Sequence, residues 1–173
     1  MEKRIVTVSR EFGSGGRSVG KALAKRLGWK YYDKELVKAV AEKTGFDPRF
    51  IEERGEFSVG KSLLSYALAG QGMPGVMNGM SASDFLWCMQ REVILKLAEE
   101  GGCVIVGRCA DYVLDGTENL VRLFVYAEIE ERINKVREKG YFPEEDILKN
   151  IKRIDRGAPR LLPLLYRKEL GES

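Results

Sequence analysis

Short apolar runs of strand length alternate along the chain with longer segments in which apolar residues recur at helical spacing. The expected strands cover residues 5–8, 29–32, 103–106 and 121–126. The expected helices cover residues 19–27, 34–44, 84–100 and 128–139. Strands separated by helices on this scale predict an α/β fold whose parallel sheet is covered by helices on both faces.

The helical pattern fades between the second and third of these helices. Gly and Met are dense over residues 70–83, which favours a loop there. At 173 residues and 44% apolar composition, the chain suffices for one hydrophobic core and is short for two ordinary domains. We therefore expect a single domain over residues 1–173, with residues 45–83 as an insertion of helix and loop.

The first expected strand runs into a glycine-rich turn that leads directly into a helix. A phosphate-binding loop needs these three parts, because backbone N–H groups of the turn converge on the anion and the helix N-terminus adds its dipole. An ordinary surface turn is the alternative, since turns also collect Gly and Ser. We favour phosphate binding and expect the cofactor to contact Gly13, Ser14, Gly15, Gly16, Arg17 and Ser18.

A second segment, residues 55–62, matches the pattern G-x-x-x-x-G-K-[ST] at every position. The amino-terminal loop matches only the last three positions, with Arg17 in place of Lys. However, residues 47–54 before the second match are charged and helix-like, so no buried strand leads into it. We interpret the second match, including Lys61, as a coincidence of a short motif.

Two residues of the favoured loop depart from the usual pattern. Glu11 stands where the first Gly is usual, and Arg17 replaces the Lys. Arginine keeps the charge and can bind phosphate oxygens in a bidentate manner, but its planar head is larger and less mobile than an ammonium. Ser18 keeps a hydroxyl that can ligate Mg²⁺, as a P-loop Ser or Thr does in phosphoryl-transfer sites.

The composition excludes several classes of chemistry. The chain has no histidine, which excludes Ser-His-Asp and Cys-His nucleophilic catalysis and most metal sites. Its three cysteines include no C-x-x-C pair, so neither a disulfide framework nor a zinc site is indicated. Phosphoryl transfer stays open, because it depends on positioning and on charge stabilisation by Lys, Arg and Mg²⁺.

Charge and hydropathy bear on partners and location. A formal charge of +3 with interleaved acidic and basic residues gives no basic footprint, so small anionic substrates fit better than nucleic acid. The longest apolar stretches, such as residues 124–127 and 161–165, are far below transmembrane length, and the first residues do not form a signal peptide. We expect a cytoplasmic protein with no membrane partner.

Ligands of open parallel sheets collect at the carboxyl ends of the strands. This rule places the loop at 13–18, Asp33 and the turn at 107–111 around one crevice. Asp33 is equally compatible with a helix N-cap before residues 34–44, and Arg108 with a surface cap, and either role can coexist with ligand binding.

Four segments carry a resemblance to a known family. They are residues 9–20 around the loop, residues 31–33, residues 104–108, and residues 124–127 with Glu131 and Arg132. These segments resemble the cytidylate kinase-like family, a branch of the P-loop nucleoside monophosphate kinases. The chain departs from that family at Val106, where an Asp coupled to Mg²⁺ is expected, and at Gly157, where an Asp is expected between two lid arginines.

The resemblance implies transfer of the γ-phosphoryl group of ATP, with Mg²⁺, to a nucleoside monophosphate, with CMP or dCMP as the first expected acceptor. It implies a three-layer P-loop kinase fold in which residues 45–83 cover the acceptor and residues 137–160 form a lid region. The residues expected to stabilise the transferred group are Arg17, Arg153 and Arg160. Asp33, Arg108 and Asp111 are expected to bind the acceptor, and Ser18 is expected at the metal.

Two further arginines, Arg132 and Arg137, have two interpretations. In the first, they are lid arginines that meet the transferred phosphoryl group. In the second, they form ion pairs at i,i+4 spacing with acidic residues such as Glu128 and Glu131 on a solvated helix.

The end of the chain carries a further expectation. Members of the resembled family continue past a Gly-Glu-Ser such as residues 171–173 into one more strand and helix. We therefore expect the C-terminal strand to be missing and the strand at 121–126 to form an open edge, which a homodimer would cover.

Two rival functions come from other classes. A nucleotide sensor that kept the fold and lost turnover is favoured by Arg17, Val106 and the short C-terminus. A dinucleotide-dependent oxidoreductase is disfavoured, because the glycines do not fall as G-x-G-x-x-G.

Overall fold

A four-stranded parallel sheet forms the centre of the protein, in the computed structural model that describes residues 4–56 and 82–157. The strands are β1 (Ile5–Arg10), β2 (Lys30–Tyr32), β3 (Cys103–Val106) and β4 (Leu120–Val125), in the order β2-β3-β1-β4. β1 lies between its neighbours, with Val8 opposite Val106 of β3 and Arg10 opposite Val125 of β4. Because the strands are parallel, their carboxyl ends meet at one edge of the sheet.

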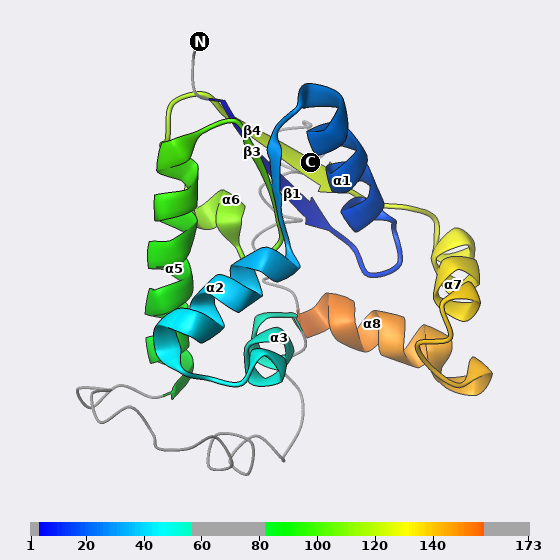
Figure 1. Cartoon of the computed structure of the whole chain (residues 1–173). Helices are drawn as coiled ribbons and strands as arrows, with labels where there is room; N and C mark the ends of the chain where they lie inside the picture. The colour runs from blue at the N-terminus through cyan, green and yellow to red at the C-terminus, as the bar shows by residue number, and fades with distance from the viewer. Residues whose placement is uncertain (1–3, 57–81, 158–173) are drawn as a thin grey trace.

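One face of the sheet is covered by helix α1 (Gly16–Leu27) (Figure 1). Alternate residues of the central strands point to this face, because successive side chains of a strand alternate. The core on this side contains Val6, Val8, Val104 and Val106, with Ala24 of α1 against them.

The opposite face carries α2 (Lys34–Thr44), α3 (Pro48–Glu56), α5 (Ala82–Glu100) and the short α6 (Ala110–Val113) (Figure 1). Ile5 and Ile105 from the strands pack there with Leu36, Ile51 and Ile94 from the helices. Each of these five side chains is at most 3% exposed. The helices on both faces give the three layers of the fold.

Two further helices lie beyond the carboxyl ends of the strands (Figure 1). These are α7 (Ile129–Glu138) and α8 (Ile147–Gly157), joined through a 3₁₀ turn at Glu144–Asp146. Val136, Ile147 and Ile151 form a separate small core between them, and Phe12 from the loop after β1 packs against it. The loop after β1 is therefore part of the packing of this helix pair.

The predicted α/β fold with a parallel sheet between helices is confirmed. The strand predicted at 103–106 and the helix predicted at 34–44 have the bounds that the structure shows, and the other strands and helices differ by a few residues at their ends. α6 and α8 were not predicted. β4 lies at an edge of the described sheet. The further strand that the resemblance implies would follow residue 173, so its expected loss stays a prediction.

None of the helices in the described part of the chain combines the length and the apolar character that crossing a bilayer requires.

Candidate functional site

The glycine-rich loop joins the end of the central strand β1 to the start of α1. Gly13 and Gly15 have φ angles of 82° and 91°, a left-handed conformation that glycine adopts without steric cost. The Ser14 N–H and the Ser14 hydroxyl both donate to the Glu11 carbonyl, at 3.3 Å and 2.9 Å. These bonds close a tight turn immediately before the helix.

The first turn of α1 opens directly from this bend. Gly15 is the N-cap residue and has no side chain that could cap the helix N–H groups. Those amides lack intrahelical partners by geometry, and together with the helix dipole they favour an anion. A Cβ on Gly16 would lie 2.5 Å from Cβ of Arg10, so the bend also leaves no room for a side chain there. The expected strand, tight turn and helix N-terminus are all present.

The competing match at residues 55–62 begins inside a helix. Gly55 and Glu56 are the last residues of α3, so a helix and not a strand leads directly into the match. Lys61 and the rest of that match lie outside the described residues. The helical stretch predicted before Gly55 is confirmed.

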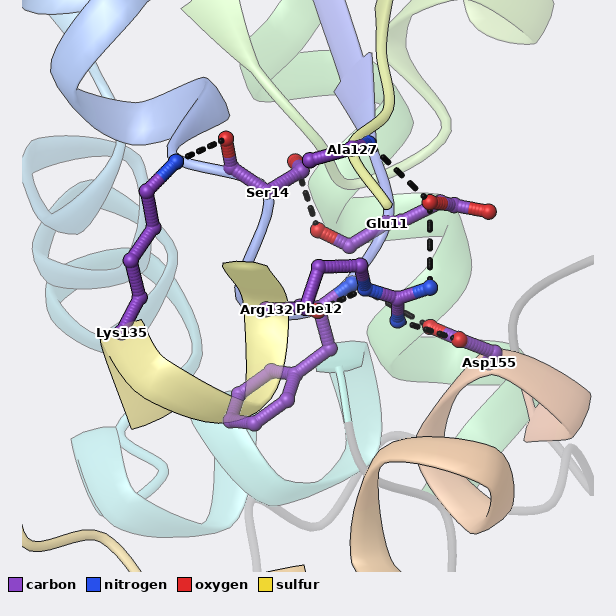
Figure 2. Close-up of polar contacts among 7 residues, drawn as sticks. All are labelled: Glu11, Phe12, Ser14, Ala127, Arg132, Lys135 and Asp155. Atoms are coloured by element: carbon purple, nitrogen blue, oxygen red, sulfur yellow. Dashed lines mark hydrogen bonds and ion pairs between the residues drawn. The ribbon is translucent and has the colours of Figure 1, made fainter. Parts of the chain in front are cut away.

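A buried arginine fastens α7 to the loop. Arg132 is 5% exposed, and its Nε donates to the Phe12 carbonyl at 2.8 Å. Its Nη1 donates to the Glu11 carboxylate at 3.0 Å, and its Nη2 donates to the carboxylate of Asp155 on α8. Figure 2 shows the guanidinium between these partners. The interpretation of Arg132 as a solvated i,i+4 partner of Glu128 is therefore wrong, because the side chain turns inward to the loop.

Glu11, which stands where the first loop Gly is usual, completes the attachment. Its Oε2 accepts the bond from Arg132 and also a bond from the Ala127 N–H at 3.4 Å. The Phe12 N–H donates to Asp155 Oδ1 at 3.1 Å. The backbone on both sides of the Phe12 peptide is thus held by charged side chains from α7 and α8.

Lys135 extends from the same helix across the loop (Figure 2). Its Nζ donates to the Ser14 carbonyl at 3.4 Å and would lie 3.6 Å from a Cβ on Gly15. The ammonium therefore stands beside the N-terminus of α1, at the position where the loop would meet an anion.

Arg17 turns from the first turn of α1 toward the end of β2. Its Nε lies 3.1 Å from Oδ2 of Asp33, a residue that is 7% exposed. Asp33 occupies the N-cap position of α2, but its side chain makes no capping hydrogen bond. The carboxylate is directed to Arg17 instead. Asp33 therefore occupies the predicted N-cap position, but its side chain does not cap the helix.

Tyr31 shares this contact. Its hydroxyl donates to Asp33 Oδ2 at 3.5 Å. Burial, and after it the Asp33 carboxylate, raise the pKa of Tyr31 to about 12. A pocket of about 280 Å³ opens here between the starts of α1 and α2, lined by Arg17, Ser18, Lys21, Tyr31, Asp33, Lys34 and Glu35.

The turn after β3 forms the third part of the site. Gly107, Arg108 and Cys109 have φ angles of 72°, 59° and 53°, and consecutive non-glycine residues in this region store strain. Nη1 of Arg10, from the end of β1, would lie 1.9 Å from a Cβ on Gly107. The Arg10 side chain therefore spans from the glycine-rich loop to the end of β3.

Arg108 and Asp111 lie buried behind this turn, each 6% exposed. Arg108 Nη1 donates to the Ile51 carbonyl of α3 at 2.7 Å. Among the described residues, Asp111 Oδ1 has no hydrogen-bond partner. The turn is thereby attached to α3, the described part of the predicted insertion.

The remaining predicted residues are less central. Ser18 is exposed and lines the pocket. Arg153 is exposed on α8, and Arg137 forms an exposed ion pair with Glu144. Arg160 lies outside the described residues.

The N–H and ammonium donors at the loop suit phosphate oxygens better than a metal ion held by protein side chains alone. Uncapped helix amides and the Lys135 ammonium suit phosphate oxygens. The described residues contain no cluster of three Cys, Asp or Glu side chains that could hold a metal ion. Mg²⁺ would therefore depend on the Ser18 hydroxyl together with phosphate oxygens and water.

Sequence reasoning missed Arg10, Glu11 and Lys135 as parts of the site. Arg10 gave a weak signal, as a charged residue directly after the apolar and small polar residues of the first strand. Lys135 gave none, because its contact with Ser14 joins residues that are 121 positions apart.

Comparisons with known proteins agree with this architecture. A model described as the cytidylate kinase-like family matches residues 5–173. The chain resembles the crystal structure of an uncharacterized protein from Eubacterium ventriosum ATCC 27560, with a TM-score of 0.59 and 24% sequence identity, over 88% of this chain and 71% of that chain. At this identity the likeness concerns the fold alone. The chain matches no curated protein.

Proposed function

Because the chain belongs to the cytidylate kinase-like family, we propose that it transfers the γ-phosphoryl group of ATP to a nucleoside monophosphate, with CMP or dCMP as the first acceptor. In this reaction an acceptor phosphate oxygen forms a bond to the γ-phosphorus while the bond to the leaving oxygen of ADP breaks. The protein has to hold both nucleotides in line and stabilise the charge on the transferred group.

The observation that carries the proposal is the bend at residues 13–16 on the end of the central strand. Its glycines, with φ of 82° at Gly13 and 91° at Gly15, leave the first N–H groups of α1 without a side-chain cap. Side chains of Arg10, Arg132 and Val136 pack against the bend itself. This arrangement suits the phosphates of ATP, since preorganised N–H donors need no rearrangement when charge develops.

We assign the acceptor to the ends of β2 and β3, beside the glycine-rich loop. Asp33 lines the pocket beside Arg17, and Arg108 and Asp111 lie behind the adjacent turn. The Arg108 bond to Ile51 connects this turn with α3. This connection supports the assignment of residues 45–83 as a cover for the acceptor. A shift of Arg108 on acceptor binding would be passed to α3 through this hydrogen bond.

We assign stabilisation of the negative charge on the transferred group to arginines around the donor and acceptor sites. Arg17 stands between the loop and Asp33, and Arg153 and Arg160 remain candidates from the lid region. Mg²⁺, when bound, neutralises phosphate charge, and Ser18 would contribute its hydroxyl. The single domain, the homodimer and the cytoplasmic location stay predictions.

A nucleotide sensor without turnover is the second candidate. The engagement of Arg17 by Asp33 and the apolar Val106 at the end of β3 favour it. Both candidates predict ATP binding, and only the kinase predicts consumption of ATP that depends on an acceptor.

A coupled ADP-release assay separates the two. The protein is supplied with ATP and Mg²⁺ and with each common nucleoside monophosphate in turn, and a reaction without acceptor serves as the control. We expect acceptor-dependent ADP release, fastest with CMP or dCMP. Binding of ATP without release on any acceptor would establish the sensor instead.

A further inference from the structure

The loop lacks the lysine that P-loop enzymes place on the β- and γ-phosphates. Arg17 stands at that position of the sequence, but its Nε is engaged by Asp33 at 3.1 Å, toward the end of β2. A planar guanidinium held there is not equivalent to a mobile ammonium above the bend. Arg17 can therefore meet the phosphates only from the side of Asp33, and a cation above the bend would have to come from another element.

Lys135 of α7 stands where that cation would be. Its Nζ donates to the Ser14 carbonyl at 3.4 Å, and it would lie 3.6 Å from a Cβ on Gly15, the N-cap of α1. Figure 2 shows the side chain extending from α7 to the loop at Ser14, and Lys135 is exposed. The 3.4 Å bond is long for an ammonium, so a phosphate oxygen can replace the carbonyl at little cost.

The anchor of α7 fixes where this ammonium stands. Arg132 precedes Lys135 by one helical turn, so the two side chains lie on the same side of α7. Arg132 is buried in its bonds to Glu11, Phe12 and Asp155. Lys135 is exposed, and among residues 4–56 and 82–157 its hydrogen-bond partner is the Ser14 carbonyl. Arg132 thus holds α7 against the loop, and Lys135, one turn later, is accessible to a ligand.

We propose that Lys135 binds the β- and γ-phosphates of the nucleoside triphosphate and supplies the ammonium that Arg17 does not. This inference rests on the proposed function, because it assigns a residue to the same phosphate site. It makes Lys135 a contact residue, whereas Arg132 is a positioning residue that acts through the loop backbone.

The experiment compares ATP binding, with Mg²⁺ present, by the full chain and three variants, measured by titration calorimetry. Lys135→Ala removes the ammonium, Lys135→Gln keeps an N–H donor for the Ser14 carbonyl without the charge, and Lys135→Arg keeps the charge. Lys139→Gln, at the exposed end of the same helix, is the matched control for loss of one positive charge. Inorganic tripolyphosphate is titrated in parallel as a probe of the phosphate contacts alone.

We expect Lys135→Ala and Lys135→Gln each to weaken ATP and tripolyphosphate binding by about tenfold to hundredfold, the range for one hydrogen bond to a charged group. Lys135→Arg should recover most of the affinity, and Lys139→Gln should bind as the unchanged protein does. Affinity retained by Lys135→Gln would overturn the proposal, because the lysine would then serve only to hold the loop. Failure of the unchanged protein to bind ATP would overturn the proposed function as well.

Discussion

Arg17 and Asp33 form an ion pair with 3.1 Å between Nε and Oδ2. The arginine belongs to the first turn of the helix after the glycine-rich loop, and the aspartate follows β2 as the N-cap residue of α2. The two residues that we assign to the donor side and the acceptor side are therefore in direct contact. Binding of an acceptor at Asp33 would change the charge environment of Arg17.

Replacement of Asp33 tests this division of the site. Asp33→Asn keeps the shape of the side chain and removes the charge that engages Arg17. We expect the KM for the acceptor to rise at least tenfold, because a charged hydrogen bond to the acceptor is lost. The KM for ATP should not rise, because Arg17 is released from its ion pair and stays available to the phosphates. Steady-state kinetics with each substrate varied in turn measure both values. An equal rise in both KM values would contradict the assignment of Asp33 to the acceptor.

Tyr31 should titrate far above an ordinary tyrosine. Burial, followed by the Asp33 carboxylate, raises its pKa to about 12. Because the pKa is raised in the folded state, the contribution of Tyr31 to stability is complete below the unfolded value near 10 and is lost as the pH rises toward about 12.

The near-ultraviolet absorbance of the protein during a pH titration, with Tyr31→Phe subtracted, measures this ionisation. Asp33→Asn should lower the pKa of Tyr31, yet leave it above the ordinary value because burial is the larger cause. A pKa near 10 in the unchanged protein would show that Tyr31 is not held in this environment.

Arg132 should be among the most costly residues of the helix pair to remove. Arg132→Ala leaves the carboxylates of Glu11 and Asp155 without their cation, and the Phe12 carbonyl loses a donor. We expect a loss of about 2–3 kcal/mol in the free energy of unfolding, below the full cost of breaking a buried pair because both carboxylates remain partly solvated.

Arg137→Ala is the matched control, since Arg137 lies on the same helix and pairs with Glu144 at the surface. Its removal should cost much less stability, because water and salt screen an exposed ion pair. Urea denaturation of the two variants compares them directly, and equal losses would contradict the anchoring role of Arg132.

Replacement of Gly107 should have two separable effects, one on the backbone and one on the Arg10 side chain. Its φ is 72°, which strains any residue with a Cβ, and that Cβ would lie 1.9 Å from Nη1 of Arg10. Gly116 has a φ of 76° and nothing within 4 Å, so Gly116→Ala isolates the strain alone. We expect Gly116→Ala to cost about 1 kcal/mol of stability with ATP binding unchanged. Gly107→Ala should cost more and should also weaken ATP binding, because Arg10 must move away from the loop.

Much of the fold follows from local patterns. β3, an unbroken apolar run at 103–106, and α2, with its regular apolar face, have the predicted bounds because periodicity and turn residues determine them locally. α6 has only four residues and gives no periodic signal. α8 was missed even though its apolar residues are helically spaced, because its segment was interpreted only through the lid arginines.

The candidate site was less accessible to sequence reasoning. The glycines indicated the bend, since strand, turn and helix are consecutive in the chain. The partners that hold the bend come from α7 and α8, and the bond between Phe12 and Asp155 joins residues 143 positions apart. A contact of that kind has no local pattern, so Arg132 was equally compatible with a surface ion pair until the fold was known.

The central claim is that residues 13–18, and not residues 55–62, hold the triphosphate of ATP. The most direct test is the dissociation constant of ATP with Mg²⁺ for Arg17→Ala and for Lys61→Ala, each compared with the unchanged protein. We predict that Arg17→Ala weakens ATP binding by about tenfold through loss of a cation beside the loop, while Lys61→Ala binds ATP as before. Weaker binding by Lys61→Ala with full affinity in Arg17→Ala would contradict the account.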